Sequence, residues 1–187
     1  MARVGVLALQ GGYAAHATAL RELGHTVTLV REATDLDALD GLVLPGGESS
    51  THLKLLRRHG LWAALDTFVR SGKPVLATCA GLILAARAVR QPAQQSFGWL
   101  DVEVARNAWG RQLESFEAIA DEGPLGRIPL MFIRAPRLIE LGADVEILAT
   151  FEGEPIAIQQ ANVVGVAFHP ELTDDRTVHA RVFGRGA

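Results

Sequence analysis

The sequence predicts an α/β protein: a three-layer sandwich in which helices cover a central, mostly parallel sheet, with extra short antiparallel strands. Apolar runs of strand length alternate with helical patterns through the first half of the chain. These runs are continuously apolar, which is typical of parallel strands buried on both faces. From residue 91 onward, shorter strand-like runs replace the alternation, and we expect some of them to be antiparallel.

The first half begins with an apolar run that ends at Gln10-Gly11-Gly12 and a helical pattern that Gly24 stops. Gly72-Lys73-Pro74 later turns the chain into another strand. The strands expected in this half are residues 4–9, 26–30, 42–44 and 75–78. The helices expected in this half are residues 14–23, 50–58, 61–71 and 80–89.

The second half contains mainly strand-like runs. The expected strands are residues 102–105, 116–120, 130–132, 145–151, 156–159 and 163–168. A short helix at 176–183, capped by Asp174, is expected to end the fold.

Size and composition indicate an ordinary globular protein. The 187 residues fit one domain, residues 1–187, and 49% of them are hydrophobic. A net charge of −3 gives no electrostatic footprint for nucleic acid. Neither a signal-peptide apolar region nor a membrane-length apolar stretch is visible, so we expect a cytoplasmic protein. The pattern predicts no metal site and no cofactor.

Cys79 is the single cysteine, so it can form neither an intrachain disulfide nor a multi-cysteine zinc site. It stands where the strand at 75–78 meets the helix predicted to begin at Ala80. A nucleophile on such a turn points outward, and the next amide can bind an oxyanion. Because free cysteines are often buried as small hydrophobic residues, Cys79 alone does not decide between catalysis and packing.

A nucleophilic thiol needs a nearby base, which is usually histidine. His169 ends the buried run 163–168 and should emerge at the sheet edge where ligands bind. Glu171 follows two residues later, and positions i and i+2 of an extended chain point the same way. The pattern therefore predicts a Cys-His-Glu triad of Cys79, His169 and Glu171.

The other five histidines occur in or beside polar helical faces and turns, where a solvated surface position is expected. They are His16, His25, His52, His59 and His179.

Several motifs together carry a family resemblance. They are Leu9-Gln10-Gly11, Pro45-Gly46-Gly47-Glu48-Ser49, Thr78-Cys79-Ala80-Gly81, Arg106-Asn107-Ala108-Trp109-Gly110-Arg111-Gln112, Ser115-Phe116-Glu117, Phe132-Ile133-Arg134-Ala135-Pro136 and Phe168-His169-Pro170-Glu171-Leu172-Thr173. With them the chain resembles the class I, triad-type glutamine amidotransferases, which have a flavodoxin-like fold. Within that family it is most similar to the glutaminase subunits of pyridoxal 5'-phosphate synthase, from residue 4 to about residue 179.

The resemblance implies hydrolysis of L-glutamine to L-glutamate and ammonia through a glutamyl thioester on Cys79, with His169 as base and Glu171 as its orienter. It also implies roles for two further groups of residues. The oxyanion hole would be formed by the amides of Gly47 and Ala80. The glutamine-binding residues would be Gly47, Glu48, Ser49, Arg106, Ile133 and Arg134.

The resemblance further implies a partner, the synthase subunit that receives the ammonia, with Gln10 near that interface. The chain departs from the family pattern at Ala77, where glycine is usual, in a glycine of Leu9-Gln10-Gly11-Gly12, where alanine is common, at Trp109, where phenylalanine is common, and in a short C-terminus. The residues leave three alternatives open: a glutaminase subunit of another amidotransferase, a non-catalytic module on the same fold, and a related cysteine peptidase or hydrolase.

Overall fold

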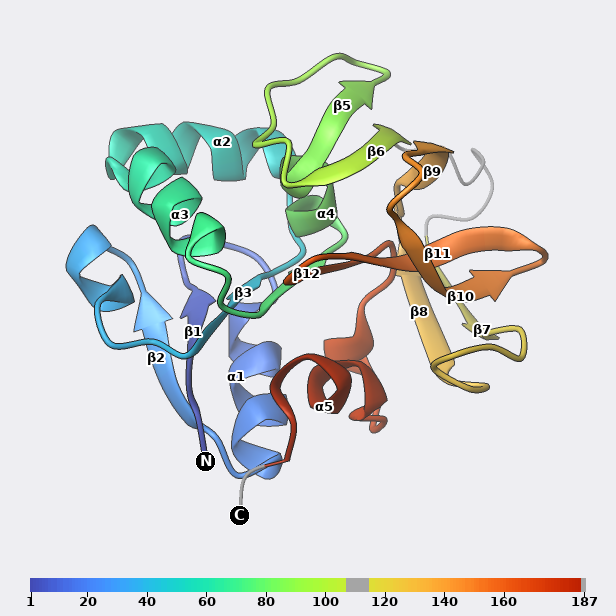
Figure 1. Cartoon of the computed structure of the whole chain (residues 1–187), viewed down its shortest axis with the longest axis horizontal. Helices are drawn as coiled ribbons and strands as arrows, with labels where there is room; N and C mark the ends of the chain where they lie inside the picture. Colours follow the sequence, from blue (N-terminus) through green and yellow to red (C-terminus); the bar gives the residue numbers. More distant parts are fainter. Residues whose placement is uncertain (107–114, 186–187) are drawn as a thin grey trace.

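The central sheet supplies the strand ends on which the site is built. In a computed structural model, which describes residues 1–106 and 115–185, its strands run in the order β10-β11-β12-β4-β3-β1-β2 (Figure 1). The strands from β12 to β2 are parallel, and β10 and β11 pair antiparallel at one edge. The strand bounds are β1 Arg3–Leu7, β2 Thr26–Val30, β3 Gly41–Leu44, β4 Val75–Thr78, β10 Glu146–Phe151, β11 Glu154–Gln160 and β12 Val163–Val166.

The core lies along β3, β4 and β12, where every residue is buried. Burial on both faces explains why these strands are continuously apolar in the sequence. Ala77 belongs to this group, fully buried in β4 between Leu44 of β3 and Gly165 of β12. The predicted mostly parallel sheet with antiparallel additions is confirmed.

Helices cover both faces of this sheet. Figure 1 shows α1 and α5 on one side and α2, α3 and α4 on the other. Their bounds are α1 Tyr13–Glu22, α2 Ser49–Arg58, α3 Leu61–Arg70, α4 Ala80–Ala85 and α5 Thr177–Phe183, with 3₁₀ turns η1 at Ala33–Leu36 and η2 at Pro170–Leu172. The right-handed connections of parallel strands place α1 and α2 on opposite faces, because the connection from β1 to β2 and the connection from β3 to β4 run in opposite directions along the sheet.

Smaller sheets flank the core. One has the order β5-β6-β9, and β7 pairs antiparallel with β8. The bounds are β5 Ala86–Arg90, β6 Leu100–Ala105, β7 Ser115–Ile119, β8 Pro129–Ile133 and β9 Arg137–Leu141. β9 was not expected from the sequence; it is a short edge strand whose Ile139 remains 46% exposed.

The helix predicted at 80–89 is wrong in its second half. It ends at Ala85, and residues 86–90 form β5, parallel to β6. Two cross-strand ion pairs, Arg87 with Asp101 and Arg90 with Glu103, hold this pairing. The five-residue run Ala86-Arg87-Ala88-Val89-Arg90 is too short and irregular to distinguish the helical period from the strand period, so its partner strand decided the outcome.

The C-terminal helix also begins differently. Asp174 does not cap it; Asp175 Oδ1 accepts a hydrogen bond of 2.8 Å from the Thr177 amide. The helix itself begins at Thr177, one residue later than predicted.

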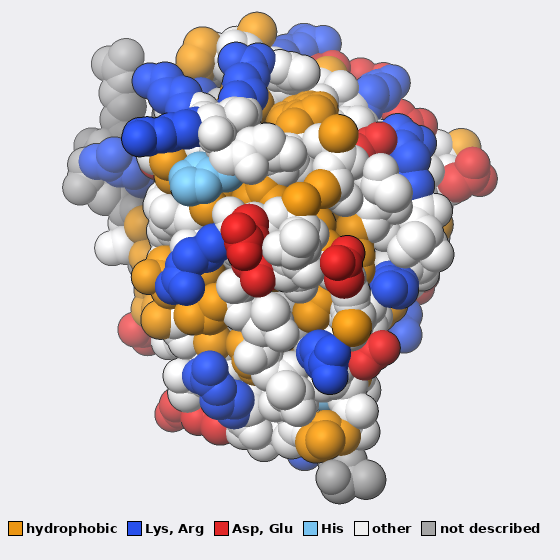
Figure 2. Space-filling view, turned by 90° about the vertical axis from the view of Figure 1, so that its left-hand side faces the viewer, with side chains coloured by type: hydrophobic (Ala, Val, Ile, Leu, Met, Phe, Trp, Pro, Cys, Tyr) orange, Lys and Arg blue, Asp and Glu red, His pale blue; other side chains and the backbone are white. Residues whose placement is uncertain are grey.

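One face of the molecule carries charges of both signs. Figure 2 shows Lys and Arg interspersed with Asp and Glu across it, with small hydrophobic areas between them. In the described residues, no helix is long and apolar enough to cross a membrane.

Candidate functional site

Cys79 stands on a sharp turn between β4 and α4. Its φ of 46° and ψ of −100° lie outside the regions that L-residues usually adopt, at a cost of about 1–3 kcal/mol. Hydrogen bonds hold it there, from the Cys79 amide to Val166 O at 2.8 Å and from the Ile83 amide to Cys79 O at 3.1 Å. A Cβ at Gly81 would collide with the Leu44 carbonyl oxygen, so only glycine permits this close approach of α4 to β3.

His169 and Glu171 lie beside this turn. The His169 amide donates to Met131 O at 2.8 Å, and its Nδ1 lies 2.8 Å from Glu171 Oε1. The contact matches the sequence expectation, but the geometric reason differs. Pro170 begins the 3₁₀ turn η2, so Glu171 folds back toward the ring instead of aligning with it along an extended chain.

The charges in this group are strongly coupled. Burial lowers the pKa of His169, but its hydrogen bonds with Cys79 and Glu171 and their charges outweigh burial and raise that pKa to about 10. Burial opposes ionisation of Glu171, yet His16 and the bond to His169 hold its pKa below the ordinary value. The raised pKa of His169 thus favours an imidazolium that interacts with the Glu171 carboxylate and with Cys79.

The glycine loop after β3 touches the same group. A Cβ on Gly46 would collide with the His169 ring, and one on Gly47 would come within 2.7 Å of the Gln10 amide. Gly47 also has a φ of 147°, which disfavours other residues. Two glycines therefore allow the loop to approach closely, Gly46 to the His169 ring and Gly47 to the Gln10 side chain.

A cavity of about 360 Å³ opens beside Cys79 and His169. Its remaining lining residues are Gly47, Glu48, Ser49, Ile83, Arg106, Ile133 and Arg134. All six residues predicted for glutamine binding are among them. Ala80 is fully buried and is not part of the lining, although its amide directly follows Cys79. Ile83, which the sequence reasoning missed, lies one helical turn beyond Cys79.

One wall of the cavity is held by a polar network. Arg106 donates to Glu48 Oε1 at 2.9 Å and to Gln94 Oε1 at 3.1 Å. Ser49 Oγ donates to the same Gln94 oxygen at 3.0 Å. Gln94 was missed from the sequence, because nothing local to its loop indicates contact with Ser49, 45 positions away, or with Arg106, 12 positions away.

Gln10 lies against the glycine loop. Its Nε2 donates to Glu48 O at 3.1 Å, and the Glu48 amide contacts its Oε1 at 3.5 Å. The side chain therefore braces the loop that lines the cavity. Its location at a partner interface stays a prediction.

The surface positions predicted for the other histidines are wrong in four of five cases. His16, His52 and His179 are fully buried and His25 is 6% exposed, whereas His59 is exposed. A signal for His16 existed, since it precedes Leu20 by four residues and Leu23 by seven, on one helical face.

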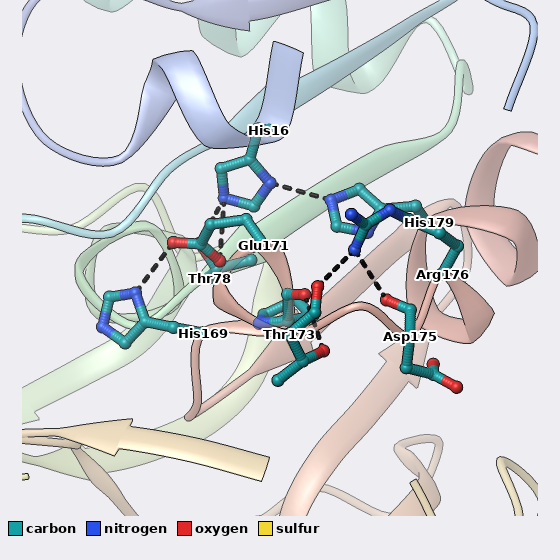
Figure 3. Close-up of polar contacts among 9 residues, drawn as sticks. His16, Thr78, His169, Glu171, Thr173, Asp175, Arg176 and His179 are labelled. Atoms are coloured by element: carbon teal, nitrogen blue, oxygen red, sulfur yellow. Dashed lines mark hydrogen bonds and ion pairs between the residues drawn. The ribbon is translucent and has the colours of Figure 1, made fainter. Parts of the chain in front are cut away.

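His16 and His179 extend the group around Glu171 (Figure 3). His16 Nδ1 lies 2.9 Å from His179 Nε2, and His16 Nε2 lies 3.2 Å from Thr78 Oγ1 and 3.3 Å from Glu171 Oε2. Burial is the main cause that lowers the pKa of His16 to about 4 and that of His179 to about 3. Both rings are therefore neutral at pH 7.

Two further findings concern metal binding and the residues after Arg106. Within the described part of the chain, no group of three or more His, Cys, Asp or Glu side chains could hold a metal ion.

Of the subfamily segment that begins at Arg106, residues 107–112 lie outside the described residues.

Comparisons with known proteins agree with this geometry. The family model described as "SNO glutamine amidotransferase family" matches residues 6–185. A pyridoxal 5'-phosphate synthase subunit PdxT of Thermotoga maritima is 44% identical over 179 residues, covering 95% of each chain. The subunit of the same name from Natronomonas pharaonis is 46% identical over 190 residues, covering 98% of this chain and 99% of the relative.

Solved structures show the same fold. A crystal structure of a glutamine amidotransferase superposes with a TM-score of 0.90 at 41% identity, covering 96% of each chain. The PurLQS structure from Thermotoga maritima superposes with a TM-score of 0.72 at 17% identity, covering 97% of this chain and 98% of that one, and shows the fold alone.

Proposed function

This chain belongs to the SNO glutamine amidotransferase family, and from that premise we propose that it is the glutaminase subunit of a pyridoxal 5'-phosphate synthase. It hydrolyses L-glutamine to L-glutamate and ammonia, and it delivers the ammonia to the synthase subunit. The observation that carries the proposal is that Cys79, His169 and the six predicted glutamine-binding residues line one cavity.

The chemistry runs through a thioester. The Cys79 sulfur attacks the side-chain amide carbon of glutamine, and the C–N bond breaks as His169 gives its Nε2 proton to the leaving ammonia. His169 then takes a proton from water, whose oxygen attacks the thioester and releases glutamate and the thiol. Throughout, Glu171 Oε1 accepts the His169 Nδ1–H and keeps the ring in one tautomer.

The negative oxygen of each tetrahedral intermediate needs fixed donors. We assign them to the amides of Gly47 and Ala80, the first on the glycine loop and the second at the start of α4. Donors held by the backbone need no rearrangement as charge develops, and loss of one such donor typically costs about 100-fold or more in rate.

The amino-acid end of glutamine needs groups of both signs. Arg106 and Arg134 supply donors for the α-carboxylate, and Glu48 supplies an acceptor for the ammonium. The ion pair between Arg106 and Glu48, braced by Gln94, supports this assignment because it places both charges on one cavity wall.

The chemistry of the product, ammonia, implies a partner protein that receives it. Ammonia released into water at neutral pH is mostly protonated and no longer nucleophilic, so a useful glutaminase delivers it through a closed path. We expect the synthase subunit to dock near Gln10 and the glycine loop, and to raise the activity of an otherwise weak glutaminase. The name shared by the relatives, a synthase subunit, supports such an assembly.

Two further parts of the proposal concern the whole chain. Residues 1–187 act as one glutaminase domain, supported by a hydrophobic cluster that includes buried residues of both the central and the smaller sheets. The cytoplasm remains the expected location, which cell fractionation would test.

The deciding experiment measures glutamate release from glutamine by the purified chain, with and without a pyridoxal 5'-phosphate synthase subunit, alongside pyridoxal phosphate formation. We expect activity to rise with the partner. Cys79→Ser should lower activity at least about 1,000-fold while the protein stays folded. Full activity in that variant, or equal rates with and without the partner, would contradict the proposal.

A further inference from the structure

A chain of buried polar side chains continues behind Glu171, away from the cavity. It begins at Oε2 of that carboxylate, passes through His16 of α1 and ends at His179 of α5 (Figure 3). Glu171 is 6% exposed, and both histidines are fully buried. The glutaminase chemistry proposed above uses Oε1 of Glu171 and leaves these histidines without a role.

The hydrogen positions in this chain follow from what each atom can accept. An ionised Glu171 has no proton to donate, so the nitrogen of His16 that faces it must carry one. Nε2–H of His16 then forms its hydrogen bond with Thr78 Oγ1 at 3.2 Å. Glu171 Oε2 lies 3.3 Å from the same nitrogen but has no hydrogen-bond partner among the described residues, so its contact with His16 is electrostatic.

The other ring nitrogen of His16, Nδ1, determines the direction of the hydrogen bond with His179. A neutral His16 with its proton on Nε2 can only accept at Nδ1, so His179 donates to it through Nε2 at 2.9 Å. The reverse assignment would direct a lone pair of His16 at the carboxylate. It would also bury an N–H of His179 at Nδ1, an atom that has no hydrogen-bond partner among the described residues.

The contacts of Arg176 hold α1, the segment after η2 and α5 together. Arg176 Nε donates to Glu22 Oε2 of α1 at 2.7 Å, and its Nη1 donates to the carbonyl oxygens of Thr173 and Asp175. These contacts join the end of α1, the segment after η2 and the start of α5. The separation between His16, Glu171 and His179 is thereby set by rigid elements.

We propose that His16, held in one tautomer by His179, is a positioning residue that fixes Oε2 of Glu171 so that Oε1 stays directed at His169. This role rests on the proposed glutaminase function. His16 thus becomes a fourth member of the triad. It reaches Glu171 from α1 and is held by His179 of α5, two helices that do not line the cavity, and it orients the carboxylate that in turn orients His169.

Two variants of His16 separate its contacts. A glutamine amide can place an N–H near the position of Nε2, whereas an asparagine amide reaches only the position of Nδ1. His16→Gln should therefore retain most of kcat, and His16→Asn should lower kcat about 10-fold or more while KM for glutamine changes less than about 2-fold. A purely structural role would give both variants similar defects.

The pH profile provides a second readout. The titratable groups that face Glu171 are His16 from α1, His169 beside it and His179 from α5. Arg176, at the start of α5, acts on His179. Without an N–H near Oε2, the ionised carboxylate loses a favourable contact. The acid limb of kcat/KM should therefore move to higher pH by about half a unit or more in His16→Asn, and stay in place in His16→Gln.

His25→Gln is the matched control. His25 is a nearly buried histidine that bonds Gly184 O at 3.0 Å and accepts from the Ala2 amide at 3.3 Å, at the other end of α5 from the cavity. The control should lose stability but keep the pH profile. Equal kcat in His16→Asn and the wild type, or a shifted profile in the control as well, would overturn the proposal.

A direct measurement on the wild type needs no variant and no activity. Nitrogen-15 NMR of the histidine rings should show His16 and His179 each neutral and protonated on Nε2 at pH 7. Protonation of His16 on Nδ1 would overturn the proposal even if the chain is an active glutaminase. Failure of the glutaminase function would instead appear as an inactive wild type with the synthase subunit present.

Discussion

At the scale of single residues, the site depends on glycines that let backbone approach reactive side chains. Gly46 packs against the His169 ring, and Gly12 packs against Glu171 so closely that a Cβ would stand 2.8 Å from Oε1. Apart from the family motif that contains Gly46, neither position looks special in the sequence, because a Gly-Gly pair alone indicates only a turn. Each is required by a contact with a residue more than 100 positions away.

Gly46→Ala should remove most of the activity. The added methyl must displace the His169 ring, and a displacement of about 1 Å can cost on the order of 100-fold in rate. The measurement is kcat for glutamine hydrolysis with the synthase subunit present. Gly123→Ala is the control, since its Cβ would meet ordinary contacts at 3.7 Å and its φ is not positive. A Gly46→Ala protein with wild-type kcat would contradict the assigned position of His169.

At the scale of elements, the segment between β11 and β12 is tied to the end of α3. Asn162 Nδ2 donates to Val69 O at 2.9 Å and to Lys73 O at 2.7 Å. These bonds satisfy carbonyl groups near the end of α3, where helices leave acceptors unpaired. They also connect α3 to β12, the strand that precedes His169.

Asn162→Ala should destabilise the fold by about 1–3 kcal/mol, because the half-buried Lys73 carbonyl oxygen loses the Asn162 donor and the Val69 carbonyl oxygen, which also accepts from the Gly72 amide, loses one of its donors. Chemical denaturation measures this change. Gln159→Ala removes a nearby half-buried amide whose hydrogen bonds to Ala161 O and Arg181 lie near the surface, and should cost less than about 0.5 kcal/mol. If the two variants were equally stable, the Asn162 bonds would not support the end of α3.

At the scale of the whole molecule, buried histidines make stability depend on pH. Burial is the first cause that lowers the pKa of His52 to about 4, and the same holds for His16 at about 4 and His179 at about 3. Between pH 6.5 and 4 the unfolded chain binds protons that the folded chain does not, so stability falls as pH falls through this window. His169 has the opposite sign, because its pKa of about 10 gives stability that is present below pH 6.5 and lost as pH rises toward 10.

His52→Gln should make the protein less sensitive to acid. At pH 5 a histidine with a native pKa of about 4 costs about 2 kcal/mol relative to pH 8. Thermal unfolding followed from pH 8 to 5 should therefore show a smaller fall in Tm for this variant than for the wild type. His59→Gln, at an exposed position, should keep the wild-type slope. An unchanged slope in His52→Gln would mean that His52 is protonated in the folded chain.

Much of the architecture could be predicted because it depends on local pattern. The strands β2 and β4 matched in both bounds, and most other elements differed by a few residues at their ends. The cysteine turn, the histidine and the glutamate were found because each ends a continuous apolar run or follows one closely. The residues around β5 could not be predicted, because a short run that fits two periods takes the structure that its partner offers.

The sequence by itself determined which groups can do chemistry: one thiol on a turn, one histidine after a buried strand, a carboxylate two residues later, and the arginines that suit an amino acid. Only the tertiary structure decided how they are supported. His16 and His179 are buried beside Glu171, and Gln94 holds Arg106. These contacts bring together residues that are separated in the sequence. Such contacts arise from how packed helices and loops meet, and no local pattern of residues records where two elements will meet.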